Sequence, residues 1–273
     1  MIGPMFAAFR LFHPAPAAAV VALSAALGAI LATQAGLPLG DGWALTVLSV
    51  AGSQVFTGAT NDIADRERDA MGRPEKPLPS GELSMNAALW IASAGLALQL
   101  ATSWRLGGLP LALGAVATGS ALAYNLALSR TPLSPLPYLL SFGLLPAWIA
   151  AGVGVPLERV LPAIPLVAPF AMAAHLANTM RDFEADAAGG SRSLAQVLGR
   201  QASQRLAAGL ALAVGLGVGG ALLVGGRATP ASIGLGVLGL RAVAQGAVSE
   251  RRLWYGVRIA AVLWTAAWAL STA

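Results

Sequence analysis

The sequence predicts an all-α integral membrane protein, a single bundle of about nine transmembrane helices formed by one domain over residues 1–273. The composition and the recurrence of long apolar runs predict this class. Apolar residues make up 56% of the chain, only 11% of residues are charged, and the mean hydropathy is +0.69. Soluble globular domains do not have this composition. Apolar runs of about 20 residues, the length that crosses a hydrocarbon core, recur along the whole chain.

The expected helices follow one another with mostly short connections. They are apolar runs near residues 15–35, 43–60, 84–104, 109–128, 133–154, 160–178, 203–225, 228–247 and 252–271. The N-terminal segment, MIGPMFAAFRLFHPAP, lacks the cleavage pattern of a signal peptide, so we expect residues 1–35 to be retained. Only the connections after the second and sixth runs are long, polar and acidic. These two connections are the expected place for chemistry.

The distribution of basic residues predicts the orientation in the membrane. With a cytoplasmic N terminus, thirteen Lys and Arg residues fall on the cytoplasmic side. The other side holds three, and Arg241 lies inside a span. This asymmetry is typical of the positive-inside rule. Because both acidic connections follow even-numbered helices, we expect them on the cytoplasmic face, and we expect the protein in the inner (cytoplasmic) membrane of a prokaryotic cell.

The composition also limits the kinds of site that the chain can build. There is no Cys, which excludes disulfides and thiolate chemistry and leaves oxygen or imidazole as metal ligands. The two His residues, His13 and His175, lie far apart in sequence, so we expect no His-based metal site. The net charge of +5 could favour nucleic acid, but in a membrane protein basic cytoplasmic loops account for it.

The first acidic connection opens with NDIADRERD, residues 61–69, which carries six formal charges in nine positions. Residues four apart lie on one face of a helix. Asn61, Asp62, Asp65 and Asp69 therefore fall within an arc of about 100°. The spacing predicts a stripe of carboxylate and amide groups at the end of the second helix.

The second acidic connection repeats this spacing. Asn178, Asp182 and Asp186 follow the pattern N-x3-D-x3-D that is also formed by Asn61, Asp65 and Asp69. Nine of the twelve acidic residues of the chain lie in the two connections. The repeated spacing hints at an old duplication of a helix bundle, although the flanking residues differ.

Carboxylates gathered at one mouth repel one another and need counter-cations. Ligation by carboxylate and amide oxygens points to Mg²⁺, which commonly bridges a few carboxylates to substrate phosphates. After the first stripe, RPEKPLPSG (residues 73–81) places Arg73 and Lys76 on a loop stiffened by prolines. This pair suits a diphosphate that already carries Mg²⁺. The simpler alternative is a solvated charged loop at each helix end, and two matching stripes argue against it.

These residues resemble the UbiA superfamily of intramembrane prenyltransferases. The first motif of that family, N-D-x-x-D-x-x-x-D, matches NDIADRERD at every fixed position, and the second, D-x-x-x-D, matches DFEAD at residues 182–186. RPEKPLPSG resembles the stretch after the first motif in branches such as chlorophyll synthase and the archaeal geranylgeranylglyceryl phosphate prenyltransferases. The resemblance covers essentially the whole chain, and its nine-helix fold agrees with the predicted spans.

The resemblance implies a set of site residues. The expected Mg²⁺ ligands are Asn61, Asp62, Asp65, Asp69, Asp182 and Asp186. The expected catalytic residues are Asp62, Asp65, Arg73, Lys76 and Asp182. The expected substrate contacts are Asn61, Arg73, Lys76, Tyr124, Arg130 and Asn178. One departure concerns the fourth helix, because many members place a Lys after the Tyr, whereas YNLALSR offers only Arg130 as a substitute.

The resemblance implies ionisation of a polyprenyl diphosphate, transfer of the prenyl group to a lipophilic acceptor, and release of diphosphate. A terpene cyclase with the same diphosphate site is the first alternative. A transporter of a phosphorylated lipid is another, but the chain lacks the paired broken helices of transporters. A CDP-alcohol phosphotransferase is disfavoured because its D-G-x-x-A-R stretch is missing. Quinone, chlorophyll-type, glycerolipid and carotenoid acceptors all remain open.

Overall fold

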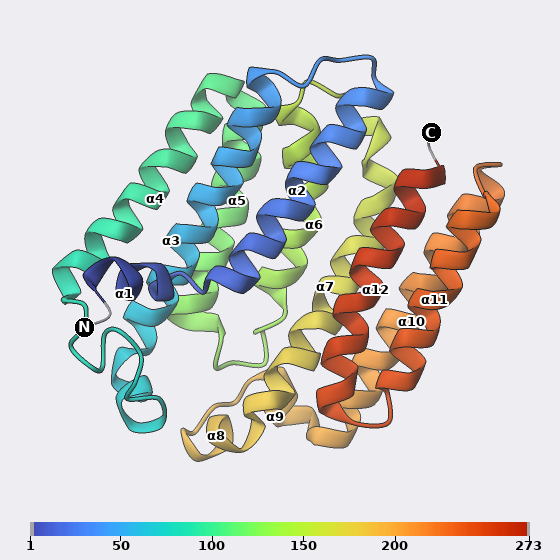
Figure 1. Ribbon diagram of the computed structural model, residues 1–273. Coiled ribbons are helices and arrows are strands. Elements are labelled where there is room, and N and C mark those ends of the chain that lie inside the picture. The colour runs from blue at the N-terminus through green and yellow to red at the C-terminus, as the bar shows by residue number, and fades with distance from the viewer. Residues whose placement is uncertain (1–2, 272–273) are drawn as a thin grey trace. The chain divides into compact units, whose positions relative to one another are not determined.

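The computed structural model describes residues 3–271, and these residues form helices and connecting loops without a β-strand (Figure 1). The chain divides into two compact units. Unit 1 comprises Met1–Ala127 and Leu144–Val160, and unit 2 comprises Leu128–Gly143 and Leu161–Ala273. The expectation of a single domain over the whole chain stays a prediction.

Unit 1 is built around one long helix, α3, which packs against both α2 and α4 (Figure 1). Its elements are α1 (Pro4–Leu11), α2 (Pro14–Gln34), α3 (Asp41–Gly72), α4 (Met85–Leu106), α5 (Gly108–Ala123), the π-helical turn η1 (Tyr124–Leu128), the second part of α6 (Leu136–Gly152) and the 3-10 turn η2 (Leu157–Arg159). The helix expected over residues 43–60 thus continues to Gly72. The first acidic motif is therefore part of α3.

Close approach of two glycines fixes α3 against α4. A Cβ atom at Gly52 would lie 2.6 Å from the carbonyl oxygen of Gly95, and one at Gly95 would lie 2.8 Å from the backbone nitrogen of Phe56. Small residues facing each other let membrane helices pack backbone to backbone. The middle of α3, just before the motif, is therefore in backbone contact with α4.

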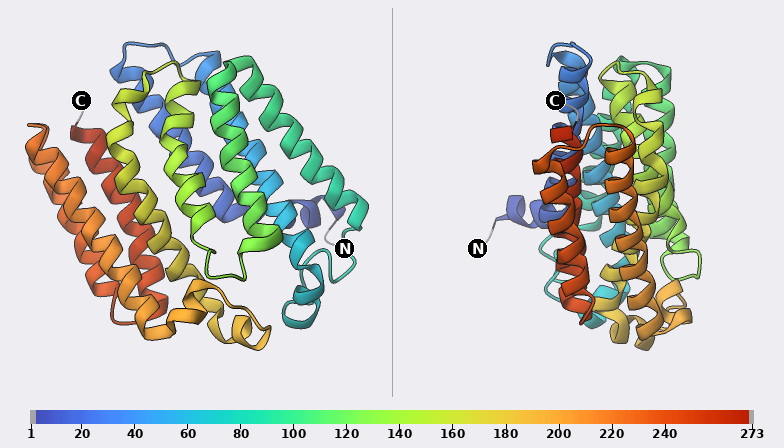
Figure 2. Two further views of the ribbon diagram at one scale, coloured as in Figure 1. Left: turned by 180° about the vertical axis from the view of Figure 1, so that it is seen from behind. Right: turned by 90° about the vertical axis from the view of Figure 1, so that its right-hand side faces the viewer.

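Unit 2 is a second helical bundle with its own apolar core. Its elements are the first part of α6, η3 (Leu161–Ala163), α7 (Ile164–Thr179), η4 (Met180–Asp182), α8 (Phe183–Ala188), α9 (Leu194–Leu198), α10 (Arg200–Val224), α11 (Pro230–Gly246) and α12 (Glu250–Ser271). Helices α11 and α12 run side by side (Figure 2). The indole of Trp264 lies over Gly215 and Gly239, where any larger side chain would collide with the ring. This packing joins α10, α11 and α12.

Each of the nine expected spans coincides with a helix, but not all of these helices have the length and hydropathy of a membrane crossing. Six segments within residues 3–271 do: Pro14–Gln34, Met85–Leu106, Gly108–Leu128, Leu157–Ala188, Arg200–Val224 and Glu250–Ser271. Helix α6 is apolar but shorter, and α11 has 17 residues. The prediction of an all-α membrane protein is confirmed, whereas nine crossings and a cytoplasmic face for the motifs stay predictions.

Candidate active site

The first acidic motif forms the C-terminal turns of α3, where two of its carboxylates turn inward. Asp62 and Asp69 are seven residues apart, about two helical turns, so they lie on the same face. Their exposed fractions are only 2% and 6%. Asp65, between them, is half-buried and forms an ion pair with Arg68 on the next turn. Buried carboxylates need cationic or N–H partners, because water no longer solvates them.

The loop after α3 supplies that partner. The ammonium group of Lys76 donates to Asp62 Oδ1 at 2.8 Å and to Asp69 Oδ2 at 2.7 Å. The two bridged oxygens therefore lie no more than 5.5 Å apart, the sum of these distances. Buried Leu78 and Leu83 anchor the loop in the apolar core of unit 1. The loop thus places Lys76, the only Lys of the chain, against the predicted metal ligands Asp62 and Asp69.

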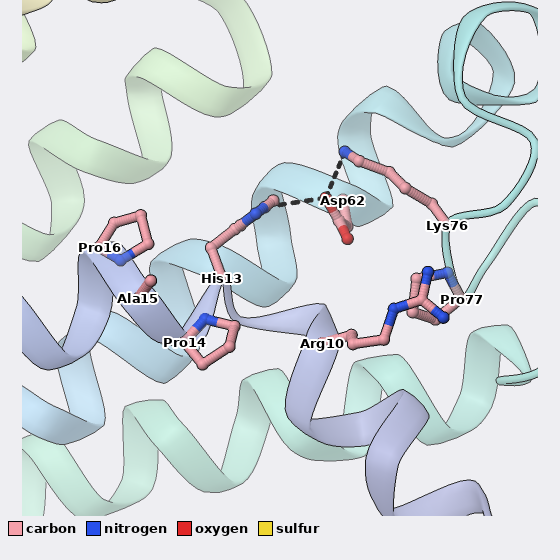
Figure 3. A pocket seen from close by; sticks show the side chains of 8 residues that line it. All are labelled: Arg10, His13, Pro14, Ala15, Pro16, Asp62, Lys76 and Pro77. Carbon is pink, nitrogen blue, oxygen red and sulfur yellow. Dashed lines mark hydrogen bonds and ion pairs between the residues drawn. The ribbon is translucent and has the colours of Figure 1, made fainter. Parts of the chain in front are cut away.

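A second donor comes from the junction between α1 and α2. His13 Nε2 lies 3.0 Å from Asp62 Oδ1, the same oxygen that Lys76 contacts. Figure 3 shows the imidazole and the ammonium reaching Asp62 from two sides. Sequence reasoning excluded a His-based metal site but did not place His13 beside the motif. The sequence feature that could have indicated this position is a His directly before Pro14 at the start of the first span.

These side chains border a pocket of about 270 Å³. Its lining residues are Arg10, His13, Pro14, Ala15, Pro16, Asp62, Lys76 and Pro77 (Figure 3). Arg10 forms an exposed ion pair with Glu82 at 3.1 Å. The lining combines Arg10 and Lys76, each already paired with a carboxylate, with three prolines. The pocket therefore offers charged N–H donors beside an apolar wall.

The electrostatics of the site favour ionised groups. Asp62 and Lys76 lie beyond the expected membrane span of α3. Burial by itself raises the pKa of Asp62, but hydrogen bonds and electrostatic attraction from His13 and Lys76 outweigh it and hold this pKa below the ordinary 3.8. Burial likewise lowers the pKa of Lys76, but Asp62 and Asp69 outweigh it and hold this pKa above the ordinary 10.5. The carboxylate and the ammonium are both charged at neutral pH.

A hydrogen-bond network joins the start of the motif to the π-helical turn η1. Asn61 Nδ2 donates to Asn125 Oδ1 at 3.3 Å, and Asn125 Nδ2 donates to the Thr57 carbonyl and to Thr60 Oγ1, both at 2.9 Å. Asn125 is buried and follows the predicted substrate residue Tyr124, which is half-buried. Sequence reasoning missed Asn125, although an Asn inside an apolar span was a visible signal. π-Helical turns often occur at functional sites.

Other predicted residues of the first motif and its loop lie at the rim. Arg73 is exposed and caps the C-terminal end of α3, where its backbone N–H donates to the Asp69 carbonyl at 2.7 Å. The structure thus brings Asp62, Asp69 and Lys76 into contact within unit 1, while the side chain of Asn61 contacts Asn125. It places Arg73 and Asp65 on the adjoining surface.

The second motif lies in unit 2 at a change of helix type. Asn178 is in the last turn of α7, Asp182 ends the 3-10 turn η4, and Asp186 is on α8. The expected stripe on one continuous α-helix is therefore interrupted. The two carboxylates are partly exposed. Arg130 holds the connection after the motif, because its guanidinium donates to the Gly189 carbonyl.

The donor set of the first motif fits Mg²⁺. Within residues 3–271, no three Asp, Glu or His side chains converge closely enough to enclose a metal ion. Mg²⁺, however, is usually bound by one or two carboxylates, keeps several waters and takes further ligands from substrate phosphates. Asp62 and Asp69 match this pattern, since they supply two carboxylates on one face of α3 and Lys76 contacts only one oxygen of each. The residues present thus suit a divalent cation with a phosphate-bearing ligand.

The fold and the site define a class of protein: a helical membrane protein with paired carboxylates and a lysine loop at the end of one long helix. Within this class, the chain belongs to the UbiA prenyltransferase family, whose model matches residues 21–254. The matched region includes both acidic motifs and the lysine loop. The resemblance inferred from the motifs is therefore confirmed.

Individual relatives cover part of the chain. A digeranylgeranylglyceryl phosphate synthase of Methanoculleus marisnigri is 31% identical over 67% of this chain and 65% of its own length. The bacteriochlorophyll synthase 33 kDa chain of Cereibacter sphaeroides is 33% identical over 62% of this chain and 59% of its own length. The match thus spans less than two thirds of the length of either relative.

Solved structures share the fold over nearly the full chain. A digeranylgeranylglyceryl phosphate synthase structure superposes with a TM-score of 0.75, 16% identity and 98% coverage of both chains. A UbiA homologue from Archaeoglobus fulgidus, bound to GPP and Mg²⁺, superposes with a TM-score of 0.67 and 19% identity, covering 98% of this chain and all of that one. At these identities the likeness establishes the fold.

Proposed function

We propose that this protein is a Mg²⁺-dependent intramembrane prenyltransferase. It ionises a polyprenyl diphosphate and transfers the prenyl group to a lipophilic acceptor, releasing diphosphate. The observation that carries the proposal is the Lys76 ammonium held between the buried carboxylates of Asp62 and Asp69. Membership of the UbiA family supports the reaction class.

The proposed site residues divide by role. Asn61, Asp62, Asp65 and Asp69 of the first motif are metal ligands, and Asp182 and Asp186 of the second motif are metal ligands as well. Arg73 and Lys76 contact the diphosphate oxygens, while Tyr124, Arg130 and Asn178 complete the substrate contacts. When bound, Mg²⁺ neutralises the charge that develops on the departing diphosphate. The Mg²⁺-bound and GPP-bound state of the A. fulgidus homologue supports this choice of metal and donor.

Lys76 connects the carboxylates to the diphosphate in this proposal. An ammonium group has three N–H donors. Two of them reach Asp62 and Asp69, so the third remains for a diphosphate oxygen in the adjoining pocket. Fixed donors aimed at developing charge stabilise the transition state without reorganisation.

The reaction breaks the bond between the allylic carbon and the diphosphate oxygen, and the electron pair leaves with diphosphate. A nucleophilic atom of the acceptor then forms the new bond to carbon, and the proton that it loses passes to the departing diphosphate. The apolar helices of the bundle exclude water from the allylic cation in the meantime. We place this chemistry at the cytoplasmic face of the inner membrane of a prokaryotic cell, with the prenyl chain directed toward lipid.

The acceptor is a lipophilic small molecule. Two of the relatives are named as digeranylgeranylglyceryl phosphate synthase and bacteriochlorophyll synthase, which supports acceptors of glycerolipid or chlorophyll type. The pocket beside Lys76 has cationic and proline-lined walls, and it supports an acceptor or donor with an anionic head.

Detergent-purified protein tests the proposal. It is incubated with labelled geranyl, farnesyl or geranylgeranyl diphosphate, in Mg²⁺ or EDTA, with and without a membrane lipid extract. We expect Mg²⁺-dependent diphosphate release that requires the extract and yields a prenylated lipid. Release without the extract, with a hydrocarbon product, would indicate a cyclase instead. Folded protein that binds the donors but releases no diphosphate would overturn the enzymatic proposal and leave transport.

Two matched variants on the same helix give the control. Asp62→Asn removes a buried carboxylate charge from the site at nearly constant volume, and we expect diphosphate release to fall by about 100-fold or more. Asp41→Asn makes the same change at the exposed first turn of α3, and we expect it to leave the rate unchanged. Equal rates for both variants would contradict the assigned site.

A further inference from the structure

The junction between α1 and α2 has an unusual backbone. His13 has φ 52° and ψ 67°, and among residues 3–271 it is the sole non-glycine residue with a positive φ. The left-handed region is unfavourable for residues with a Cβ, although His tolerates it better than most. Pro14, which follows, opposes a continuous helix through this point. Such conformations persist where the surrounding structure imposes them, often at functional sites.

Two contacts impose this conformation. Leu11, at the end of α1, is fully buried in the core of unit 1. The backbone of Phe12 then lies directly on α3, because a Cβ atom at Gly58 would lie 2.6 Å from the Phe12 Cα. Gly58 precedes Asp62 by one helical turn, so it is on the same face of α3. The absence of a side chain at Gly58 thus lets the junction approach the carboxylate.

The close approach of the junction to α3 brings the His13 imidazole within hydrogen-bond distance of Asp62. A carboxylate oxygen accepts, so Nε2 of His13 carries the proton and donates to Asp62 Oδ1 at 3.0 Å. Lys76 donates to the same oxygen from the other side at 2.8 Å (Figure 3). Two donors on Oδ1 fix the plane of the carboxylate. Both donors bind Oδ1, so Oδ2 is the oxygen that remains for a further cation.

We propose that His13 is a positioning residue for Asp62: its imidazole orients the carboxylate, so that Oδ2 is presented to Mg²⁺. This inference rests on the proposed function only in taking Asp62 as a metal ligand. Hydrogen-bond partners of metal ligands set ligand orientation, and their loss typically weakens metal binding by about 10- to 100-fold.

Three variants separate the hydrogen bond from the backbone conformation. His13→Gln places an amide N–H at nearly the reach of Nε2, but Gln adopts the left-handed region poorly. His13→Asn tolerates that region, but its amide stops short of Asp62. His13→Gly also tolerates the region and has no donor. If the hydrogen bond matters, the Gln variant should bind Mg²⁺ more tightly than the Asn and Gly variants. If only the backbone conformation matters, the Gln variant should bind Mg²⁺ most weakly.

The readout is the dissociation constant for Mg²⁺, measured by calorimetry on detergent-purified full-length protein with inorganic diphosphate present. We expect the Asn and Gly variants to raise this constant about 10-fold or more. The Gln variant is expected to retain most of the wild-type affinity, whatever its thermal stability. Retained affinity in the Asn and Gly variants, or a loss confined to the Gln variant, would overturn the inference.

A second test leaves His13 in place. Gly58→Ala forces the Phe12 backbone off α3, and we expect Mg²⁺ affinity to fall as in His13→Gly. The matched control is Gly119→Ala, because a Cβ atom at Gly119 has no neighbour within 4 Å. Unchanged affinity in folded Gly58→Ala protein would contradict the proposed approach of the junction.

Prenyl transfer measured in parallel distinguishes the two proposals. If wild-type protein binds Mg²⁺ and the variants weaken it, but no donor is consumed, the positioning role stands and the proposed function fails. If the wild type transfers prenyl groups and the three His13 variants bind Mg²⁺ equally well, the positioning role alone fails. If the wild type does not bind Mg²⁺ at all, both fail.

Discussion

Replacing Lys76 by Met is expected to destabilise the metal-free protein. The oxygens of Asp62 and Asp69 that Lys76 bridges are at most 5.5 Å apart, because the ammonium lies 2.8 Å from one and 2.7 Å from the other. Two unit charges at that separation repel by about 3 kcal/mol at an effective dielectric constant of about 20. The free energy of unfolding should fall by about that amount in EDTA, close to the roughly 3–5 kcal/mol typical when a buried ion pair loses one partner.

An SDS titration of the detergent-solubilised protein, followed by circular dichroism, measures this loss. Mg²⁺ should restore most of the stability of Lys76→Met, since a divalent cation replaces the missing ammonium between the carboxylates. The control is Glu82→Gln, which breaks the exposed ion pair with Arg10 and should cost less than about 1 kcal/mol. If Lys76→Met in EDTA is as stable as the wild type, the bridge does not hold the site together.

Three further outcomes follow from the same contacts, each measured by the same titration. The pKa of Asp62 is lowered in the folded protein, so its contribution to stability is complete above pH 3.8 and is lost as the pH falls through the folded-state pKa. The pKa of Lys76 is raised, so its contribution is complete below pH 10.5 and is lost as the pH rises through the folded-state pKa. Metal-free stability from this pair should therefore be flat between about pH 5 and 9, and a steep slope there would contradict the assignment. Asn125→Leu breaks its three hydrogen bonds to α3 and should cost about 1–3 kcal/mol, and a neutral result would remove it from the network. Gly52→Ala should cost about 1–3 kcal/mol through its clash with α4, while Gly119→Ala, with open space, should not destabilise, so equal effects would refute the close packing.

Much of the fold was predictable because it depends on short-range patterns. Hydropathy over about 20 residues located the nine long helices within residues 3–271 without any knowledge of their neighbours, whereas the short helices α1, α8 and α9 give no such signal. Helical periodicity likewise placed Asp62 and Asp69, seven residues apart, on one face, and both side chains are buried in α3. The same reasoning failed for Asn178 and Asp182, because a 3-10 turn interrupts the α-helix between them. Local spacing does not report a change of helix type.

The sequence by itself determined the membrane class, the family and the side chains that form the first motif and its loop. Tertiary structure decided what these side chains touch. Lys76 and His13 contact Asp62 over sequence separations of 14 and 49 residues, and Asn125 contacts Asn61 over a separation of 64 residues. Hydropathy and helical period act within one helix, whereas these contacts depend on how closely α1, α4 and η1 approach α3. That approach is set by packing at positions such as Gly52 and Gly58, which no pattern along the chain identifies.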